Sequence, residues 1–397
     1  MSHISERVKN MAESATLAMA AKSRELKAQG IDIISLSLGE PDFMTPDFIK
    51  DAAKEGIDQN YSHYMPVPGY QDLREAIAGK FKRDNGLNYT ANQIVVSTGA
   101  KQSIINVIMS LVNEGDEVII PAPYWVTYYE QVALFGGIPV VIETSIDNDF
   151  KITPDQLRSA MTGKTKLMIF SNPCNPTGTA YSKDELKALA DVIATKSDFF
   201  VISDEIYEHI NFVGKNQSLA AFDNVYNQTI TVNGLSKAFA MTGWRIGYIG
   251  APVEIAKACE KIQGQFTSGT CSIAQRAAIA AMNADPSKIQ YMVDAFKKRR
   301  DLVLEKLGEI KGLKLNVPEG AFYVFPDVTN FFGKSYGSHS INSATDFSMY
   351  LLDEAKVALV TGEAFGDANC VRLSYAASED VLLEAIARIK TALEKLS

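Results

Sequence analysis

Short runs of β-branched and other apolar residues alternate with longer helical segments between about residues 94 and 250. These runs include "IVVS", "DEVIIP", "IPVVIET", "KLMIFS", "DFFVIS", "TITVNG" and "RIGYIG". Several of them are almost continuously apolar, as expected for strands that helices cover on both faces. The alternation therefore predicts a three-layer α/β domain in which the central sheet is largely parallel.

The rest of the chain predicts a second, smaller domain of the α+β class. A long helical stretch from about 253 to 311 is interrupted near Asp285-Pro286, and the short strands "GAFYVFPD" and "CVRLSYA" follow it. The closing segment 378–396 is amphipathic, and the first forty or so residues are expected to join this smaller domain. The resulting prediction is a large domain at residues 46–285 and a small domain made of residues 1–45 and 286–397.

Composition and charge disfavour several classes of protein. Of the 397 residues, 46% are hydrophobic and 22% are charged, and the formal net charge of -8 provides no basic footprint for nucleic acid. The amino terminus lacks the apolar core of a signal peptide, and no apolar run approaches the roughly 18 residues of a membrane helix. Four scattered cysteines, at positions 174, 259, 271 and 370, suit reduced thiols and have no zinc spacing. We expect a cytoplasmic protein that binds no membrane, nucleic acid or metal ion.

One basic run could suggest a patch for an acidic partner. Residues 297–300 read Lys-Lys-Arg-Arg, and Asp301 follows them within a helical pattern. A run of this kind in a helix is usually a solvated face. We therefore predict that these four side chains lie in solvent.

Small residues form the turn between "IVVS" and the next helix, in "STGAKQ" at residues 97–102. Such a turn leaves backbone N–H groups free at a helix N-terminus, where the helix dipole adds positive potential. The motif therefore suits a phosphate group, although this stretch taken alone is more simply interpreted as a tight turn without a ligand. Neither a Walker lysine motif nor a GxGxxG pattern occurs here, so a nucleotide-binding fold has no support.

Two further motifs follow predicted strands, at the edge where open α/β sheets bind their ligands. In "SNPCNPTG", at 171–178, two Asn-Pro pairs predict a rigid turn that would hold the amide of Asn175 in one orientation. In "SDEIY", Asp204 ends a buried strand, where a carboxylate is costly unless a cation meets it. Asp204 and Tyr207 could face one cleft, whereas Asp204 alone could equally be a helix cap.

Two cations stand among small, apolar and aromatic residues in "GLSKAFAMTGWRIGY", at 234–248. Burying an unpaired cation costs several kcal/mol, so Lys237 and Arg245 both require partners. A lysine in these surroundings is expected to have the depressed pKa that Schiff-base formation needs. The planar guanidinium of Arg245 suits the phosphate predicted at "STGAKQ".

In this order, the motifs resemble those of the fold type I aminotransferases that depend on pyridoxal 5'-phosphate (PLP). The resemblance is to the class I family that includes the bacterial aspartate aminotransferases. It covers nearly the whole chain, from "LGEPDF" through "YMPVPG" to "VRLSYA", and its most specific parts are "NPCNPTG", "SDEIY" and "SKAFAMTGWRIG". It implies an enzyme that moves an amino group between an L-amino acid and a 2-oxo acid by a ping-pong mechanism on PLP.

The resemblance implies roles for five residues around the cofactor ring. Lys237 would form the Schiff base and, once the substrate has displaced it, move the proton of the substrate α-carbon. Asp204 would hold the pyridine nitrogen protonated so that the ring can accept electrons. Tyr207 and Asn175 would hydrogen-bond the 3′ oxygen, and Trp125 would stack on the ring unless it is simply a core aromatic residue.

The resemblance also implies a phosphate site that involves two subunits. The phosphate would lie on the backbone of Gly99, Ala100 and Lys101, with Arg245 as its charge partner. Tyr64 would reach it from the neighbouring subunit, so a homodimer is expected. Many relatives carry a phosphate-binding serine three residues before the lysine, where this chain has Gly234. Ser236 is the neighbouring hydroxyl that could compensate.

The implied substrate site contains a second arginine. Arg372 would bind the substrate α-carboxylate through two parallel hydrogen bonds, assisted by the backbone N–H of Gly39 and by Asn175. Trp125 would also contact the substrate. A dicarboxylate specialist needs one more cation, and no motif identifies it, because Met109 stands where some relatives carry a basic residue.

Aspartate with 2-oxoglutarate, giving oxaloacetate and glutamate, is the first expectation for the reaction. Aromatic amino acids, prephenate and alanine are alternative substrates. A PLP-dependent lyase or decarboxylase is a rival on the same scaffold. A regulator with a preceding DNA-binding domain is disfavoured by the negative charge, and an NAD-dependent dehydrogenase by the lack of a GxGxxG turn.

Overall fold

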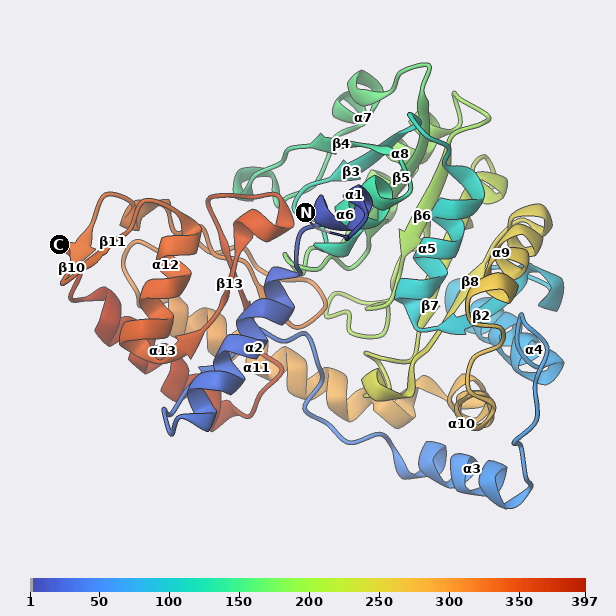
Figure 1. Cartoon of the computed structure of the whole chain (residues 1–397), viewed down its shortest axis with the longest axis horizontal. Coiled ribbons are helices and arrows are strands. Elements are labelled where there is room, and N and C mark those ends of the chain that lie inside the picture. Colours follow the sequence, from blue (N-terminus) through green and yellow to red (C-terminus); the bar gives the residue numbers. More distant parts are fainter. Residues whose placement is uncertain (1–2) are drawn as a thin grey trace.

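A computed structural model describes residues 3–397 and places the predicted strands in one seven-stranded sheet (Figure 1). The order across this sheet is β2-β8-β7-β6-β5-β3-β4. Neighbouring strands are parallel except around β8, which runs antiparallel to β2 and to β7. The strands are β2 (Ile94–Thr98), β3 (Glu117–Pro121), β4 (Ile138–Ile142), β5 (Thr165–Ser171), β6 (Phe200–Asp204), β7 (Thr229–Gly234) and β8 (Ile246–Gly250). The prediction of a largely parallel α/β sheet is confirmed.

Helices cover both faces of this sheet, which explains why its strands are apolar throughout. Successive side chains of a strand point to opposite faces. In β5, Leu167 and Ile169 pack into a cluster with residues of α5 (Ala100–Leu111), α6 (Thr127–Leu134) and α9 (Val253–Phe266). Met168 and Phe170 of the same strand pack into a second cluster, with α7 (Pro154–Ala160) and α8 (Lys183–Ile193). The layers are therefore helix, sheet and helix.

Local sequence fixes where several of these helices begin. Thr153 and Ser182 each accept a hydrogen bond from the third residue of α7 and α8, respectively, and the side chain of that residue bonds back to the cap. These reciprocal bonds satisfy N–H groups that have no partner within the helix. Gly99 precedes α5 with a φ of 84°, a conformation that glycine adopts without strain.

A smaller group of elements comes from the two ends of the chain. The parallel pair β1 (Ile34–Ser35) and β12 (Val357–Ala358) joins the amino-terminal segment to the carboxyl-terminal part. The antiparallel strands β13 (Val360–Thr361), β14 (Val371–Ser374) and β9 (Tyr323–Val324) form a three-stranded sheet. The other elements here are α1 (Glu6–Lys9), α2 (Ala15–Ala28), β10 (Ser335–Tyr336), β11 (His339–Ser340), α12 (Ala344–Tyr350) and α13 (Glu379–Leu393). The β1–β12 pair is the strand contact between the amino-terminal forty residues and this group.

The helical stretch predicted from 253 to 311 has one more break than expected. After α9, the chain turns at 267–271 before α10 (Ser272–Asn283), and α11 (Gln290–Gly308) follows a second break at Asp285-Pro286. In the first turn, Ser268 has a φ of 59°. Gly269 approaches Met65 so closely that a Cβ would lie 2.7 Å from its Sδ. Helix α11 runs along the base of both groups, while α10 packs on α3 (Asp47–Asp58) and α4 (Gln71–Lys80) (Figure 1).

The prediction of a solvated basic face at residues 297–300 is wrong for the two arginines. Arg299 is buried and binds the carboxylate of Asp42 through two hydrogen bonds of 2.7 and 3.0 Å. Its guanidinium also lies 5.0 Å from the ring centre of Phe43. Arg300 pairs with Asp301 and lies over the ring of Phe212. Both arginines therefore hold other segments against α11.

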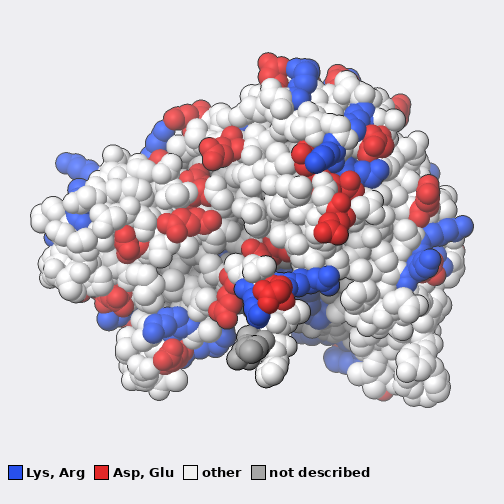
Figure 2. All heavy atoms as spheres, turned by 45° about the horizontal axis from the view of Figure 1, so that its top comes forward, with Lys and Arg blue, Asp and Glu red and all other residues white. Residues whose placement is uncertain are grey.

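Acidic and basic side chains are intermixed on the face drawn in Figure 2. Among residues 3–397, no helix combines the length and apolar character needed to cross a membrane. Within the same described part of the chain, no group of three or more His, Cys, Asp and Glu residues could hold a metal ion.

Candidate active site

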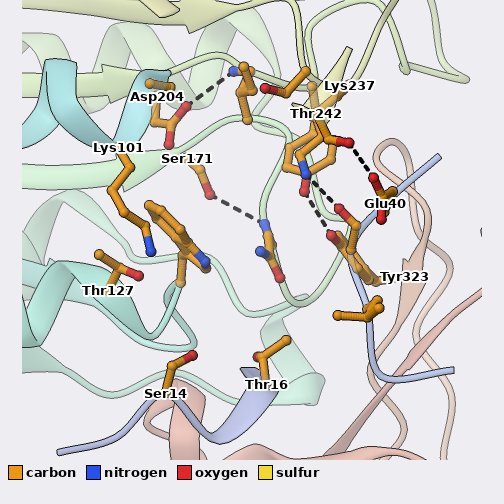
Figure 3. A pocket seen from close by; sticks show the side chains of 18 of the residues that line it. Ser14, Thr16, Glu40, Lys101, Thr127, Ser171, Asp204, Lys237, Thr242 and Tyr323 are labelled. Atoms are coloured by element: carbon orange, nitrogen blue, oxygen red, sulfur yellow. Dashed lines mark hydrogen bonds between the residues drawn. The ribbon is translucent and has the colours of Figure 1, made fainter. Parts of the chain in front are cut away.

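A cavity of about 370 Å³ lies at the carboxyl-terminal edge of the seven-stranded sheet (Figure 3). The last residues of β5 and β6, Ser171 and Asp204, line it, as does the start of α5. The smaller group of elements lines it from the other side, through β9 and β14. Parallel sheets bind ligands at this edge because the strand ends and the helix N-termini converge there.

The structure brings most of the predicted site residues to this cavity. Those that line it are Gly39, Ala100, Lys101, Trp125, Asn175, Asp204, Tyr207, Ser236, Lys237, Arg245 and Arg372. Gly99 lies just behind, against the Arg245 guanidinium, because a Cβ at position 99 would be 2.2 Å from Nη2. Tyr64 is the exception, since it is 98% exposed and does not line the cavity of its own chain.

Lys237 follows β7 and extends into the cavity (Figure 3). Its Nζ donates a hydrogen bond of 2.6 Å to the carbonyl oxygen of Gly39. Burial lowers the pKa of Lys237 to about 8, and the positive charges of Arg372 and Arg245 act in the same direction. A neutral amine is the nucleophilic form of lysine, so this side chain is poised to react with a carbonyl group.

Asp204 ends β6 and is buried at the base of the cavity. Its Oδ2 accepts a hydrogen bond of 2.7 Å from the hydroxyl of Tyr128, and its Oδ1 accepts one of 3.2 Å from the backbone N–H of Ile206. Burial raises the pKa of Asp204 to about 6, and the two hydrogen bonds and the charge of Lys237 oppose this rise. The carboxylate is therefore mostly ionised at neutral pH.

Positive charge gathers where α5 begins. Lys101 and Arg245 both line the cavity there, and the first backbone N–H groups of α5 have no partner within the helix. Loss of hydration, followed by the charge of Arg245, lowers the pKa of Lys101. No carboxylate of residues 3–397 forms a salt bridge with either side chain. Such an arrangement binds anions, and a phosphate group fits it.

Arg245 differs in one respect from the sequence expectation. Arg245 is exposed to solvent, and its Nη1 donates a hydrogen bond of 2.8 Å to the carbonyl oxygen of Thr242. The backbone of Arg245 has a φ of 58° because it turns out of a short 3₁₀ segment into β8. The free-energy cost of burying a charge therefore applies to Lys237 and not to Arg245. An anion bound at the N-terminus of α5 would be the partner of Arg245.

Arg372 is the most deeply buried cation of the site, with 1% of its surface exposed. Its Nη1 donates to Asn175 Oδ1 at 2.9 Å and its Nη2 to the carbonyl oxygen of Ser37 at 2.6 Å, whereas its Nε has no hydrogen-bond partner in the described part of the chain. The guanidinium lies over the rings of Tyr323 and Phe365, at 4.5 and 4.8 Å from their centres. No acidic side chain of residues 3–397 pairs with it. A buried guanidinium of this kind calls for an anionic ligand.

Several residues of the site were not identified from the sequence. The sequence predicts only a strand at Tyr323, yet its hydroxyl lies 2.8 Å from that of Tyr207. It also explains Gly39, where a Cβ would lie 2.1 Å from the Tyr323 oxygen. No sequence motif identifies Tyr128, although it lies three residues after Trp125. Ser14, Thr16, Glu40, Thr127 and Thr242 complete the polar lining.

Gly234, where many relatives carry serine, has a steric explanation. It pairs with Gly247 in the β7–β8 ladder. A Cβ at position 234 would lie 2.7 Å from the carbonyl oxygen of Ile246 and 3.1 Å from the Cα of Gly247. Serine would therefore require a shift of β8, while Ser236 already lines the cavity.

Comparison with protein families gives a match to the model "Aminotransferase class I and II" over residues 31–389. The chain belongs to this family. It is therefore an aminotransferase, an enzyme that exchanges amino groups between amino acids and oxo acids, and its cofactor is PLP. An amine, a buried carboxylate, a cationic helix N-terminus and a partly buried tryptophan are the groups that such a cofactor needs, and the cavity contains all four.

Individual relatives are similar along almost their whole length. The aspartate/prephenate aminotransferase of Cereibacter sphaeroides is 46% identical over 393 residues, which cover 98% of each protein. The aspartate aminotransferase of Bacillus subtilis is 45% identical, with 99% of this chain and 100% of that protein covered. Among solved structures, the aspartate aminotransferase of Rhizobium meliloti has a TM-score of 0.97 and 40% identity, with both chains fully covered. That of Thermus thermophilus with maleate has a TM-score of 0.93 and 40% identity, over 99% of this chain and 100% of the other.

Proposed function

We propose that this aminotransferase acts on dicarboxylic substrates, with aspartate and 2-oxoglutarate as its principal pair. The observation that carries the proposal is that Arg372 and Lys101, in addition to Arg245 at the phosphate site, line one cavity without a salt bridge to any acidic side chain of residues 3–397. Two relatives with names that specify aspartate, and a related structure that contains the dicarboxylate maleate, support it. Prephenate is a second candidate because it is also a dicarboxylate and appears in the name of the Cereibacter sphaeroides relative.

The cofactor assignments follow from the chemistry of each side chain. When bound, PLP supplies a carbonyl group and a ring that withdraws electrons from the substrate α-carbon. We assign Lys237 to the carbonyl carbon and Asp204 to the ring nitrogen, where a carboxylate stabilises a proton. Trp125 would stack on the ring, and Asn175 and Tyr207 would hydrogen-bond its 3′ oxygen.

The phosphate assignment uses the positive end of α5. The backbone N–H groups at Gly99, Ala100 and Lys101 would bind the phosphate oxygens, with the Arg245 guanidinium as the charge partner. Ser236 lines the same cavity and would add a hydroxyl group.

Lys237 is assigned the proton transfers at the substrate α-carbon. With a pKa of about 8, its amine is present in both protonation states near neutral pH, so it can accept a proton and return it. Arg372 and Asn175, together with the backbone N–H of Gly39, would hold the α-carboxylate. The bond between Arg372 Nη1 and Asn175 Oδ1 keeps the guanidinium plane fixed before the substrate arrives.

Lys101 is the cation proposed for the second carboxylate, which the sequence did not identify. Its Nζ lies over the ring of Trp125, 4.9 Å from the ring centre, and Trp125 also lines the cavity. Ser14, Thr16 and Thr127 line the cavity on the same side and offer hydroxyl groups to the same anion (Figure 3). A cation in this position favours dicarboxylates over alanine or aromatic amino acids.

We also propose a homodimer, a cytoplasmic location and a division into two domains. The 98% exposure of Tyr64, a large aromatic side chain, supports a contact with a second copy, whose phosphate site Tyr64 would reach. All four cysteines are free thiols, in keeping with a reducing compartment. Pairing of β1 with β12 supports a small domain of residues 1–45 and 286–397 beside a large domain of residues 46–285.

A half-reaction screen tests the substrate assignment. The holoenzyme is mixed with each standard amino acid in turn, and the absorbance change of the cofactor gives the second-order rate constant. Aspartate and glutamate should react fastest. Borohydride reduction followed by peptide mapping should place the cofactor on Lys237, and a label on another residue would refute the assignment of Lys237.

A substitution of Lys101 tests its role separately. Lys101→Met should lower the rate constant for aspartate at least about tenfold, the value of one charge-assisted hydrogen bond, and change that for alanine little. Lys166→Met is the matched control, because Lys166 also lies over an aromatic ring, that of Phe200, but does not line the cavity. Equal losses for aspartate and alanine would show that the Lys101 side chain serves the cofactor instead.

A further inference from the structure

Tyr128 is a buried side chain of α6 that lines the cavity of the candidate active site. Only 1% of its surface is exposed, and its hydroxyl lies 2.7 Å from Oδ2 of Asp204. Burial raises the pKa of Tyr128 well above its ordinary value, and the charge of Asp204 adds to this effect. The phenol therefore keeps its proton and is the donor in this hydrogen bond.

Few groups around Asp204 favour its ionised form, so the hydrogen bond from Tyr128 matters for its charge. Besides Tyr128, the titratable groups facing Asp204 are Lys237 after β7, Tyr207 after β6 and Cys174 after β5. Burial raises the pKa of both Tyr207 and Cys174, so these two remain neutral. Of the groups that favour the ionised carboxylate, the hydroxyl of Tyr128 has the largest effect, followed by the N–H of Ile206.

Tyr128 also supports Trp125. The two rings meet edge to face, with their centres 5.5 Å apart and their planes at 88°. The backbone N–H of Tyr128 donates to the carbonyl oxygen of Trp125 at 2.9 Å, which fixes the start of α6 beside the ring. One tyrosine therefore contacts both the carboxylate and the indole assigned to the cofactor ring.

We propose that Tyr128 is a positioning residue of the transamination site, one that holds Asp204 ionised and oriented and keeps the Trp125 ring in its plane. This inference rests on the roles proposed above for Asp204 and Trp125. Tyr128 itself acts through these two residues, because its hydroxyl is occupied by Asp204.

Removing the hydroxyl should weaken PLP binding in a pH-dependent way. In Tyr128→Phe, the ring and its contact with Trp125 remain, while the carboxylate loses a donor. A hydrogen bond to an ionised group is worth about one to two factors of ten in an equilibrium constant, so the dissociation constant for PLP at pH 7 should rise at least about tenfold. The loss of affinity on acidification, expected near pH 6 for the wild type, should begin about one pH unit higher, because the carboxylate protonates more readily without its donor.

Kinetics should separate positioning from a general defect. The maximal half-reaction rate of Tyr128→Phe should fall about tenfold or more with aspartate, and the concentration giving half-maximal rate should stay close to that of the wild type. Arg372 and Asn175, the residues assigned to the α-carboxylate, have no hydrogen bond with Tyr128.

The experiment is a titration of full-length apoprotein with PLP from pH 5 to pH 9, followed by absorbance. Tyr89→Phe is the matched control, because this buried hydroxyl bonds to Thr231 at 3.1 Å and does not contact Asp204. It should behave as the wild type. In an Asp204→Asn background, Tyr128→Phe should produce no further pH shift, since its effect depends on the carboxylate.

Three results would overturn the inference about Tyr128. Wild-type affinity and pH dependence in Tyr128→Phe would overturn the inference, and so would equal losses in Tyr128→Phe and Tyr89→Phe. A pH shift that persists in the Asp204→Asn background would also overturn it. If the wild type itself failed to bind PLP at Lys237, the proposed function would fail first, and the result would be distinguishable because it does not involve Tyr128.

Discussion

Arg372→Lys is expected to be a severe substitution although the positive charge is retained. Arg372 presents a planar fork whose orientation is fixed by Asn175, by the carbonyl oxygen of Ser37 and by the Tyr323 ring. A substrate carboxylate would meet two parallel N–H groups of this fork. Lysine offers a compact point charge on a flexible stem and cannot supply that geometry.

The size of the effect follows from the hydrogen bonds that are lost. A charge-assisted hydrogen bond contributes about 1.5–3 kcal/mol, and lysine can keep one of the two. The loss of the second bond alone predicts a decrease in kcat/KM of at least about tenfold, since about 1.4 kcal/mol corresponds to a factor of ten. Because the buried site also loses the guanidinium stacked on Tyr323, the measured decrease should exceed this minimum.

The assay compares half-reaction rates of wild type and Arg372→Lys with several amino acids and one simple amine. Every amino acid carries an α-carboxylate, so all amino acids should lose rate, while the amine, which lacks this group, should lose little. Similar losses for amino acids and the amine would mean that Arg372 is structural. A loss restricted to aspartate and glutamate would reverse the proposed substrate orientation and make Arg372 the residue for the second carboxylate.

Two further predictions concern the neighbouring buried acids Asp204 and Glu205 at the end of β6. Asp204→Asn should still bind PLP at saturating concentration yet slow removal of the substrate α-proton by several orders of magnitude, because a neutral amide cannot stabilise a protonated ring nitrogen; near-normal single-turnover rates would assign this role elsewhere. Glu205 faces away from the cavity towards Ser203 and Ser218, and burial, together with Glu208, raises its pKa from 4.5 to about 8. Since the folded pKa is above the unfolded one, the protonated form stabilises the fold below pH 4.5, and this contribution is lost as the pH rises towards 8. The Tm of Glu205→Gln minus that of wild type should therefore increase between pH 5 and pH 8 in thermal denaturation, and a constant difference across this range would contradict the burial of an ionisable Glu205.

Much of the architecture could be predicted from the sequence because it depends on local patterns. Nearly continuous apolar runs identify strands with both faces covered, and β5 shows this directly, with alternate residues in two different clusters. The capping boxes at Thr153 and Ser182 are likewise local, since each joins residues three apart. The motifs that carry the resemblance are also short and ordered along the chain, which is why the sequence alone can predict that Lys237 and Asp204 share one site, and both line the cavity.

Contacts between distant segments could not be predicted in this way. The bond between Arg372 and Asn175 joins residues 197 positions apart, and that between Tyr128 and Asp204 joins residues 76 apart. Arg299 shows the same limit, because its position in a basic helical run predicts solvent exposure, whereas packing against the Asp42 segment buries it. Periodicity indicates which face of an element is apolar, but not which distant side chain will lie opposite it.

The sequence by itself therefore determined the class of fold and the order of the motifs, and it predicted Lys237 as the amine that we propose for the reaction. The tertiary structure alone decided which groups surround that amine. Gly39 illustrates the division, since its glycine is required only because the Tyr323 hydroxyl, from a strand near the other end of the chain, occupies the space of a Cβ. Such a requirement arises from packing between elements, and packing is fixed only when the whole chain has folded.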